Sequence, residues 1–201
     1  MTTLRVTATL AILLSMTSAA AAAVQSLSAA DLVKELQRGG YVIVMRHASS
    51  PTAPPDAAGA DKENTTRERQ LDDAGRRAST AMGEAFRRLR IPVGEVLTSP
   101  TYRAHETARL AGWASTHDVP ALGDRGRSMQ AITDDDAAVL RQFASDPASG
   151  GNRVVITHMP NIARAFPAAG AVADGEALVF KPGGTPTLIG RMKIDDWPRV
   201  P

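Results

Sequence analysis

Three short runs of β-branched and other apolar residues, residues 41–45, 95–98 and 153–157, predict buried strands. Hydrophobicity that is continuous rather than alternating is typical of strands covered on both faces, as in parallel sheets flanked by helices. Two later runs, 177–181 and 187–193, are joined by a Pro-Gly-Gly turn and predict a hairpin-like pair.

Apolar residues at helical spacing separate these runs. Five helices are predicted. The first runs from Ser28 to about Arg38 and the second from Asp72 or Asp73 to about Arg90. The third has Ser99 as its cap and Pro100 at the first helical position, the fourth runs from a Thr133 cap to about Ser145, and the fifth begins at Pro160. Residues 49–64 predict a long loop, and residues 112–130 a looser stretch. Strands alternating with helices predict a three-layer α/β/α sandwich with a mostly parallel central sheet.

The N-terminal segment has the pattern of a secretory signal. Arg5 precedes an apolar run over residues 6–16, and an alanine tract follows at residues 19–23. The apolar run is too short to span a bilayer, which takes roughly 20 residues. The sequence therefore predicts a signal peptide at residues 1–23, a single domain at residues 24–201, and a periplasmic or secreted protein.

Composition excludes several classes of protein. The 201 residues are 43% hydrophobic, which is enough for a core, and Lys and Arg (23) nearly balance Asp and Glu (21). The arginines are dispersed, so a nucleic-acid partner is not expected. The chain has no cysteine, which excludes disulfides, thiol chemistry and a cysteine-linked lipid anchor.

The polar residues at the ends of the three predicted strands carry the candidate chemistry. Arg46-His47 follows the first strand, Ser99-Pro100 with Arg103 follows the second, and Thr157-His158 lies at the end of the third. Because ligands of α/β sheets bind at the carboxyl ends of the strands, we expect two arginines and two histidines to converge there.

This set of side chains suits a phosphate group. Arg46 and Arg103 would hold its oxygens with paired hydrogen bonds. A neutral His47 could attack phosphorus if a backbone carbonyl fixed its other nitrogen, and repulsion from the arginines would lower its pKa. His158 would donate to a phosphoryl oxygen in the transition state. No third ligand stands at a suitable spacing, so neither a metal nor another cofactor is expected.

At these motifs the chain resembles the histidine phosphatase, or phosphoglycerate mutase-like, superfamily. The resemblance rests on Arg46-His47-Ala48, Ser99-Pro100, Arg103-Ala104 with Glu106-Thr107-Ala108, and Thr157-His158, and the segment 69–75 also looks like the family's. It implies that His47 accepts the phosphoryl group and that Arg46, Arg103 and His158 form the phosphate pocket. Residues 157–162 and 175–179 look similar to secreted lipopolysaccharide core heptose phosphatases, and small phosphohistidine phosphatases are the other close type.

Some residues depart from the family or have no assigned role. Ala48-Ser49 replaces the glycine that follows the first histidine in mutases, which argues against a mutase. No motif identifies the general acid for the leaving oxygen, and the candidates are Asp61, Glu63, Asp124 and Glu176. The charged run 67–69 could contact substrate, but a solvated turn is the favoured interpretation.

These observations predict an exported phosphomonoesterase that works through a phosphohistidine. Its substrate would be a small-molecule or glycan phosphate, such as a phosphosugar, whose identity the sequence does not specify. The unassigned acid leaves open a non-catalytic phospho-ligand binding protein on the same fold. A phosphohistidine protein phosphatase is the third hypothesis, although its usual substrates are cytoplasmic. The sequence does not indicate an oligomeric state.

Overall fold

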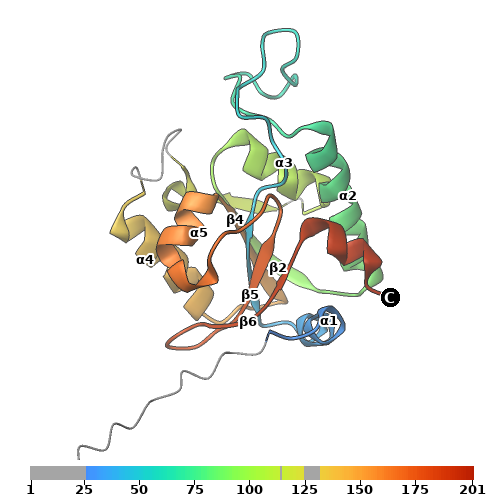
Figure 1. Ribbon diagram of the computed structural model, residues 1–201, viewed down its shortest axis with the longest axis vertical. Helices are drawn as coiled ribbons and strands as arrows, with labels where there is room; N and C mark the ends of the chain where they lie inside the picture. Colours follow the sequence, from blue (N-terminus) through green and yellow to red (C-terminus); the bar gives the residue numbers. More distant parts are fainter. Residues whose placement is uncertain (1–25, 114, 125–131) are drawn as a thin grey trace, which may run out of the picture.

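A computed structural model describes residues 26–113, 115–124 and 132–201, and their strands form one six-stranded sheet (Figure 1). The strands are β1 (Val42–Arg46), β2 (Val93–Thr98), β3 (Thr116–Asp118), β4 (Asn152–Thr157), β5 (Ala177–Lys181) and β6 (Thr187–Met192). The order is β3-β2-β4-β1-β5-β6, in which β1 to β4 are parallel and β5 and β6 are antiparallel additions.

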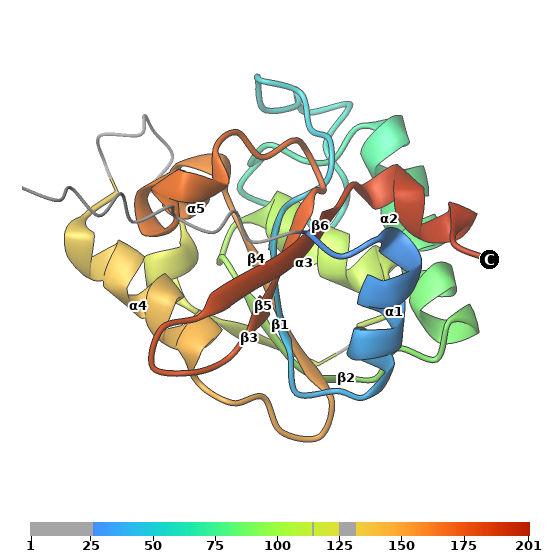
Figure 2. The same cartoon turned by 60° about the horizontal axis from the view of Figure 1, so that its bottom comes forward.

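Helices cover both faces of the sheet. They are α1 (Ala29–Gln37), α2 (Asp73–Arg88), α3 (Tyr102–Leu110), α4 (Asp134–Ser145) and α5 (Met159–Ala165), with 3-10 turns η1 (Pro120–Leu122), η3 (Pro167–Ala169) and η4 (Ile194–Arg199). Figure 2 shows α4 and α5 on one side of the sheet and α1, α2 and η4 on the other.

Alternate side chains of each central strand enter opposite cores. Ile43 and Met45 of β1 pack with α1, α2 and η4, whereas Val42 and Val44 pack with α4 and α5. Burial on both faces explains why the central strands are continuously apolar in sequence. The predicted three-layer α/β/α sandwich with a mostly parallel sheet is therefore confirmed.

Three of the predicted helix starts have the expected local chemistry. The Ser28 side chain accepts a hydrogen bond from Asp31 N, and Asp72 caps α2 by accepting from Gly75 N. Thr133 and Asp136 form a reciprocal capping box at the start of α4. These side chains satisfy backbone N–H groups that have no partner within the helix.

The predictions for Ser99 and Pro100 were wrong. The third helix begins at Tyr102 with Thr101 as its N-cap residue. Ser99 N still donates to Ile156 O of the neighbouring strand at 2.9 Å, so the backbone at Ser99 continues the extended strand. The short strand β3 was also missed, within the stretch that was expected to be loose.

The strand register brings the predicted motifs to one edge of the sheet. Arg46 pairs with Thr157, and Thr98 with Ile156, so β1, β2 and β4 end at the same level. Between β1 and α2 the chain forms no helix or strand, as expected for the predicted loop 49–64, and this loop projects beyond the same edge (Figure 1).

The predicted signal peptide, residues 1–23, lies outside the described residues. Across the ranges that are described, every helix is too short or too polar to cross a membrane.

Candidate active site

His47 and His158 lie side by side at the ends of β1 and β4, with their ring centroids 5.2 Å apart. Both are almost completely buried, with 3% and 2% of their surfaces exposed. The backbone of His47 continues the sheet, because His47 N donates to Thr157 O at 3.0 Å. The structure therefore brings together the two histidines that the sequence motifs singled out.

The hydrogen bonds of His47 fix its orientation and its tautomer. Nδ1 lies 2.7 Å from the carbonyl oxygen of Ala48, which has no proton to give, so Nδ1 is the protonated nitrogen. Nε2 accepts from Nε of Arg103 at 3.1 Å and therefore carries the lone pair. The predicted backbone-carbonyl partner of His47 is thus confirmed.

His158 has the opposite tautomer. Its Nδ1 accepts from Nη2 of Arg103 at 3.2 Å, so Nε2 bears the proton and donates to Oγ of Ser99 at 2.7 Å. Ser99, which was expected to cap a helix, instead orients this imidazole. The Nδ1 of His158 consequently faces the same guanidinium as the Nε2 of His47.

Arg103 connects the whole site. Besides the two imidazoles, its Nη2 donates to the carboxylate of Asp124. The residue is 4% exposed although it carries a permanent charge. A buried guanidinium is stable when its donors are satisfied in this way, and its planar fork holds the three partners in fixed directions.

Arg46 is held by the loop before β5. Its Nη2 lies 2.6 Å from Oδ1 of Asp174, and Nη1 donates to the carbonyl oxygen of Val172 at 3.3 Å. Its Nε is buried and has no acceptor among the described residues. A buried N–H without a partner is unfavourable, so this donor is available to a bound anion.

The segment after His47 is fixed by contacts with α3 and with the start of α2. Ala48 N donates to Oγ1 of Thr107 at 3.1 Å, and Ser49 O accepts from Asp72 N at 3.1 Å. A Cβ on Gly75 would lie 2.2 Å from Ser49 O, so α2 can pack this closely only with glycine at that position. These contacts explain the motif residues around Thr107 and the segment 69–75 without giving them a chemical role.

Burial keeps both imidazoles neutral. It is the largest of the causes that lower the pKa of His47 to about 2, followed by the repulsion that His158 would exert if both rings were protonated, and then by Arg103 and Arg46. Burial, Arg103, Arg69 and Arg46 likewise lower the pKa of His158 to about 2. The expected repulsion by arginines is present, but loss of hydration contributes more.

We expect these two histidines to make the fold sensitive to acid. The unfolded chain binds protons on both imidazoles below about pH 6.5, whereas the folded chain does not, so stability falls as the pH falls. The loss is about 2 kcal/mol for each imidazole between pH 7 and pH 5. Urea unfolding at both pH values should therefore show a much smaller loss in a His47→Asn, His158→Asn variant.

His117→Asn, the same kind of substitution on the exposed surface, is the matched control for a general effect of replacing histidine by asparagine. Equal losses in the original protein and in the double variant would contradict the buried, neutral state of the two histidines.

Of the four carboxylates considered as general acids, the structure brings Asp124 into the site. Its Oδ2 contacts Arg103 and lies 3.8 Å from Nδ1 of His158. Asp61 instead accepts from Arg76 and from the hydroxyl of Tyr102, at 2.9 and 3.1 Å. Glu63 is exposed and lines a different hollow, beside Tyr102 and His105.

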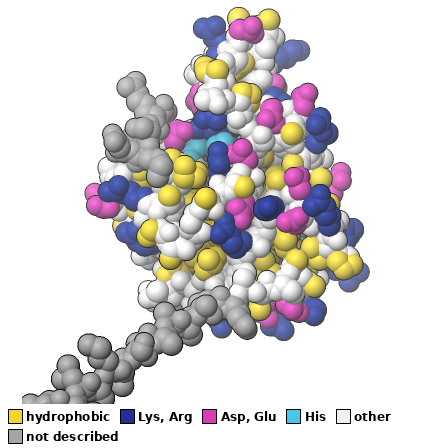
Figure 3. Space-filling model, viewed as in Figure 1, with side chains coloured by type: hydrophobic (Ala, Val, Ile, Leu, Met, Phe, Trp, Pro, Cys, Tyr) yellow, Lys and Arg dark blue, Asp and Glu magenta, His cyan; other side chains and the backbone are white. Residues whose placement is uncertain are grey.

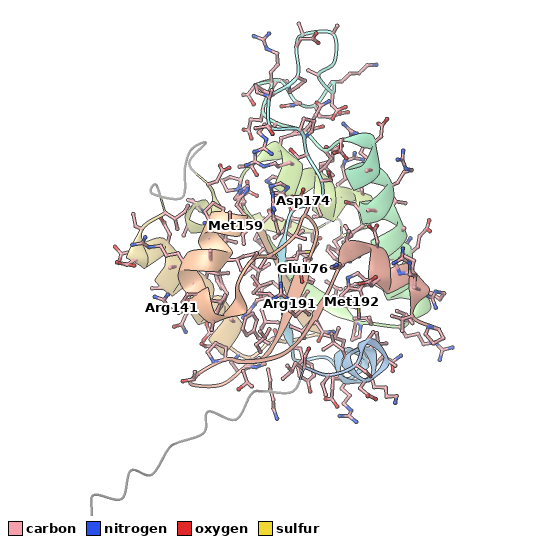
Figure 4. The ribbon with its side chains drawn as sticks, viewed as in Figure 1. Arg141, Met159, Asp174, Glu176, Arg191 and Met192 are labelled. Carbon is pink, nitrogen blue, oxygen red and sulfur yellow. The ribbon has the colours of Figure 1, made fainter. Side chains whose placement is uncertain are left out.

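Glu176 is a structural carboxylate. It accepts from Nε of Arg191 and from Ala173 N, both at 2.8 Å, and Arg191 also donates to the carbonyls of Ala169 and Ala171 at 2.7 Å. The pair therefore ties together the loop that carries Asp174; Figure 4 labels Asp174, Glu176 and Arg191. The same loop donates from Gly175 N to His47 O at 2.9 Å.

We expect Glu176→Gln to reduce stability much more than turnover. The change leaves Arg191 without its charged partner and should lower the free energy of unfolding by about 1–2 kcal/mol. Because Glu176 does not reach the histidines, kcat for phosphate-ester hydrolysis should fall less than about tenfold. A loss of kcat of about a hundredfold or more with unchanged urea stability would make Glu176 a general acid after all.

A cavity of ≈ 990 Å³ opens above Arg103 and Asp124. Its walls come from the projecting loop, from the start of α3 and from η1, and they include Arg67, Glu68 and Arg69. Figure 3 shows histidine atoms in a hollow below the projecting loop, bordered by basic and acidic side chains. Residues 67–69, for which the sequence favours a solvated turn, instead lie in the wall of this cavity, which they share with Arg103.

The sequence did not reveal the contacts that three residues near the site make, namely Asp174, Arg69 and Ser99. Asp174 precedes the Gly-Glu pair that was noted, but no pattern marks it as a partner of Arg46. Arg69 is half-buried and binds the carbonyls of Ser50 and Pro51. Ser99 was noted for capping, and only the register of β2 and β4 reveals its contact with His158.

Within the three described ranges, no three His, Asp or Glu side chains lie together in an arrangement that could hold a metal ion. The site instead gathers cationic and hydrogen-bonding groups suited to an anion: Arg103 contacts both imidazoles, and Arg46 lies at the end of the strand that leads into His47.

No protein-family model matches the chain, and no curated protein matches it in sequence. Solved structures do match its fold. The protein histidine phosphatase SixA complexed with tungstate has 20% identity and a TM-score of 0.55, covering 78% of this chain and 98% of its own. SixA from Agrobacterium tumefaciens has 14% identity and a TM-score of 0.54, with coverages of 77% and 98%.

A phosphoserine phosphatase from Entamoeba histolytica is similar to the same extent, with 11% identity, a TM-score of 0.54 and coverages of 77% and 97%. At these identities the likeness concerns the fold. The chain therefore has the phosphoglycerate mutase-like fold of the histidine phosphatases, as the strand-end motifs led us to expect.

Proposed function

We propose that this protein is a phosphomonoesterase of the histidine phosphatase type, with His47 as the nucleophile. The observation that carries the proposal is the state of His47: a neutral imidazole, fixed through Nδ1 by Ala48 O, with its Nε2 lone pair at the Arg103 fork. The matching fold of known histidine phosphatases supports the same conclusion.

The first step would be in-line attack. The substrate phosphate takes the place between Arg46 and Arg103, where the buried Nε of Arg46 gains an acceptor. The lone pair on Nε2 of His47 forms a bond to phosphorus while the bond from phosphorus to the ester oxygen breaks. Water then attacks the phosphohistidine, which releases inorganic phosphate and restores His47.

His158 would stabilise the charge on the transferring group. Its Nδ1 faces the guanidinium of Arg103 in the free protein. A bound phosphate brings negative charge next to this nitrogen, which favours its protonation, and the resulting N–H can donate to a phosphoryl oxygen. The Ser99 hydroxyl at Nε2 keeps the ring in this orientation.

Asp124 is the carboxylate placed to protonate the leaving oxygen, since it lines the cavity beside Arg103. Asp124→Asn should thus affect esters with poor leaving groups more than aryl phosphates.

The wide cavity suits a phosphate on a bulky group, such as a phosphosugar or a glycan. The N-terminal signal pattern supports an exported enzyme.

A phosphoester panel on the mature protein, in the presence of a metal chelator, tests this function. The panel would include an aryl phosphate, phosphosugars, glycan-linked phosphate and a phosphohistidine peptide. We expect phosphate release without added metal. Binding of phosphate or vanadate with no turnover on any ester would contradict the phosphatase and favour a phospho-ligand binding protein.

A further inference from the structure

The wall of the cavity contains two arginines that no carboxylate neutralises. Arg46 and Arg103, which face the histidines, are paired with Asp174 and Asp124. By contrast, no acidic side chain in the described ranges forms a salt bridge with Arg67 or Arg69. Two positive charges therefore remain at the entrance of the site.

Arg67 is held over the cavity by a strained backbone. Its φ angle is 53°, which is uncommon for a residue with a long side chain. The buried Asn64 enforces this turn, because its side chain donates to Glu68 O at 2.7 Å and accepts from Glu68 N at 2.9 Å. Arg67 N in turn donates to Asn64 O at 3.0 Å.

The turn is also anchored to the phosphate site. The carboxylate of Glu68 accepts from Tyr102 N at 2.9 Å, next to Arg103 and at the start of α3. Glu68 thus satisfies a helix N–H, and its charge is placed favourably at the positive end of that helix. The anchor fixes the distance between the arginines that flank Glu68 and the place where the transferred phosphate would bind.

Arg69 already has several partners, because it donates to Pro51 O, Ser50 O and Ser50 Oγ. The positive charge of Arg69 acts on His158 and Arg103, so Arg69 contributes to the positive potential where the transferred phosphate would bind. No hydrogen bond of the Arg67 guanidinium exists within the described part of the chain. Arg67 is therefore the cation available to a second group on the substrate.

We propose that Arg67 forms a second anion subsite, so that the preferred substrate carries a further phosphate or carboxylate on the alcohol that leaves. The inference rests on the proposed phosphatase function. Thr52, Thr66 and Thr101 line the same cavity and offer hydroxyl groups to the part of the substrate between the two anions. A hexose bearing two phosphates has this chemistry.

A matched pair of substrates tests the proposal, namely glucose 6-phosphate and glucose 1,6-bisphosphate. We expect kcat/KM for phosphate release to be about tenfold higher for the bisphosphate at low salt, since one charge-assisted hydrogen bond is of that order. The preference should decrease as the ionic strength rises, because the subsite lies at the entrance.

Arg67→Asn removes the charge and keeps a residue that tolerates the left-handed backbone, so the variant should fold as stably as the original protein. It should lower the preference for the bisphosphate to about twofold or less, mainly by reducing kcat/KM for the bisphosphate. Arg77→Asn is the control, because Arg77 is exposed on α2 and does not line the cavity. This variant should retain the full preference.

Failure of the second subsite and failure of the proposed phosphatase function give different results. Equal kcat/KM for both substrates, or a preference that survives in Arg67→Asn, overturns the second subsite and leaves the phosphatase intact. Absence of phosphate release from either substrate and from an aryl phosphate overturns the proposed function, and the subsite with it.

Discussion

His47→Ala is expected to lower kcat for phosphate release by at least about 10⁴-fold, as loss of a nucleophile does in other covalent mechanisms. Among the described residues, His158 also directs a nitrogen lone pair at the Arg103 guanidinium, through Nδ1. We assign the attack to His47, whose Nδ1–H is fixed by Ala48 O and whose Nε2 accepts from Arg103. The measurement is steady-state phosphate release from an aryl phosphate, for which leaving-group protonation matters least.

The fold should survive this substitution. The backbone contacts of His47, from His47 N to Thr157 O and from Gly175 N to His47 O, do not involve the imidazole. Unchanged binding of vanadate by the variant would show that the pocket persists. His117→Ala, on the exposed surface, should keep full activity. A His47→Ala protein with more than a few per cent of the original activity would exclude His47 as the nucleophile.

Arg103→Ala should produce the second largest effect, a fall in kcat/KM of about 10³-fold. The guanidinium holds Nε2 of His47, Nδ1 of His158 and the carboxylate of Asp124 at once, so its removal disturbs attack, transition-state charge and the candidate acid together. Such shared interactions are not additive, and the loss exceeds that of an ordinary phosphate contact.

Arg103→Lys separates charge from geometry. Lysine restores the positive charge but not the planar fork, so we expect it to recover less than about tenfold of the lost activity. Arg109→Ala, one and a half turns further along α3 and 68% exposed, is the matched control and should change kcat/KM by less than about twofold. Full activity in Arg103→Lys would mean that charge alone is required.

The sequence was sufficient to predict five of the six strands in the described part of the chain, and the convergence of Arg46, His47, Arg103 and His158 at the ends of the strands. Strands that are buried on both faces are continuously apolar in sequence. Parallel strands that end at the same level bring the residues that follow them close together. Arg46, His47 and His158 directly adjoin or end such strands, and Arg103 lies two residues into the following helix. Their convergence therefore depends on local patterns that a single sequence contains.

The roles of Ser99, Asp174 and Glu176 could not be predicted for a common physical reason. Each depends on which of several loops lies next to it, and the spacing of residues within one element carries no information about that. A Ser-Pro pair after a strand resembles a helix cap, yet the sheet register directs this serine to His158. A loop carboxylate looks the same in sequence whether it meets solvent, an arginine or a substrate.

The place of the charged run around Glu68 could not be predicted from the sequence for the same reason. In sequence it is indistinguishable from a solvated turn, and Arg67 is indeed exposed. Its position in the cavity wall follows from the buried amide of Asn64 and from the anchoring of Glu68 on α3, neither of which has a local signature.

Trapping of the covalent intermediate is the decisive experiment for His47 as the nucleophile. The protein would be mixed with an excess of aryl phosphate, quenched rapidly at alkaline pH, where phosphohistidine persists, and analysed by peptide mass spectrometry. We expect one added phosphoryl group on the peptide that contains His47, located on the His47 side chain and absent from the His47→Ala variant. Turnover with no phosphorylated His47, or with the phosphoryl group on His158 instead, would contradict this role of His47.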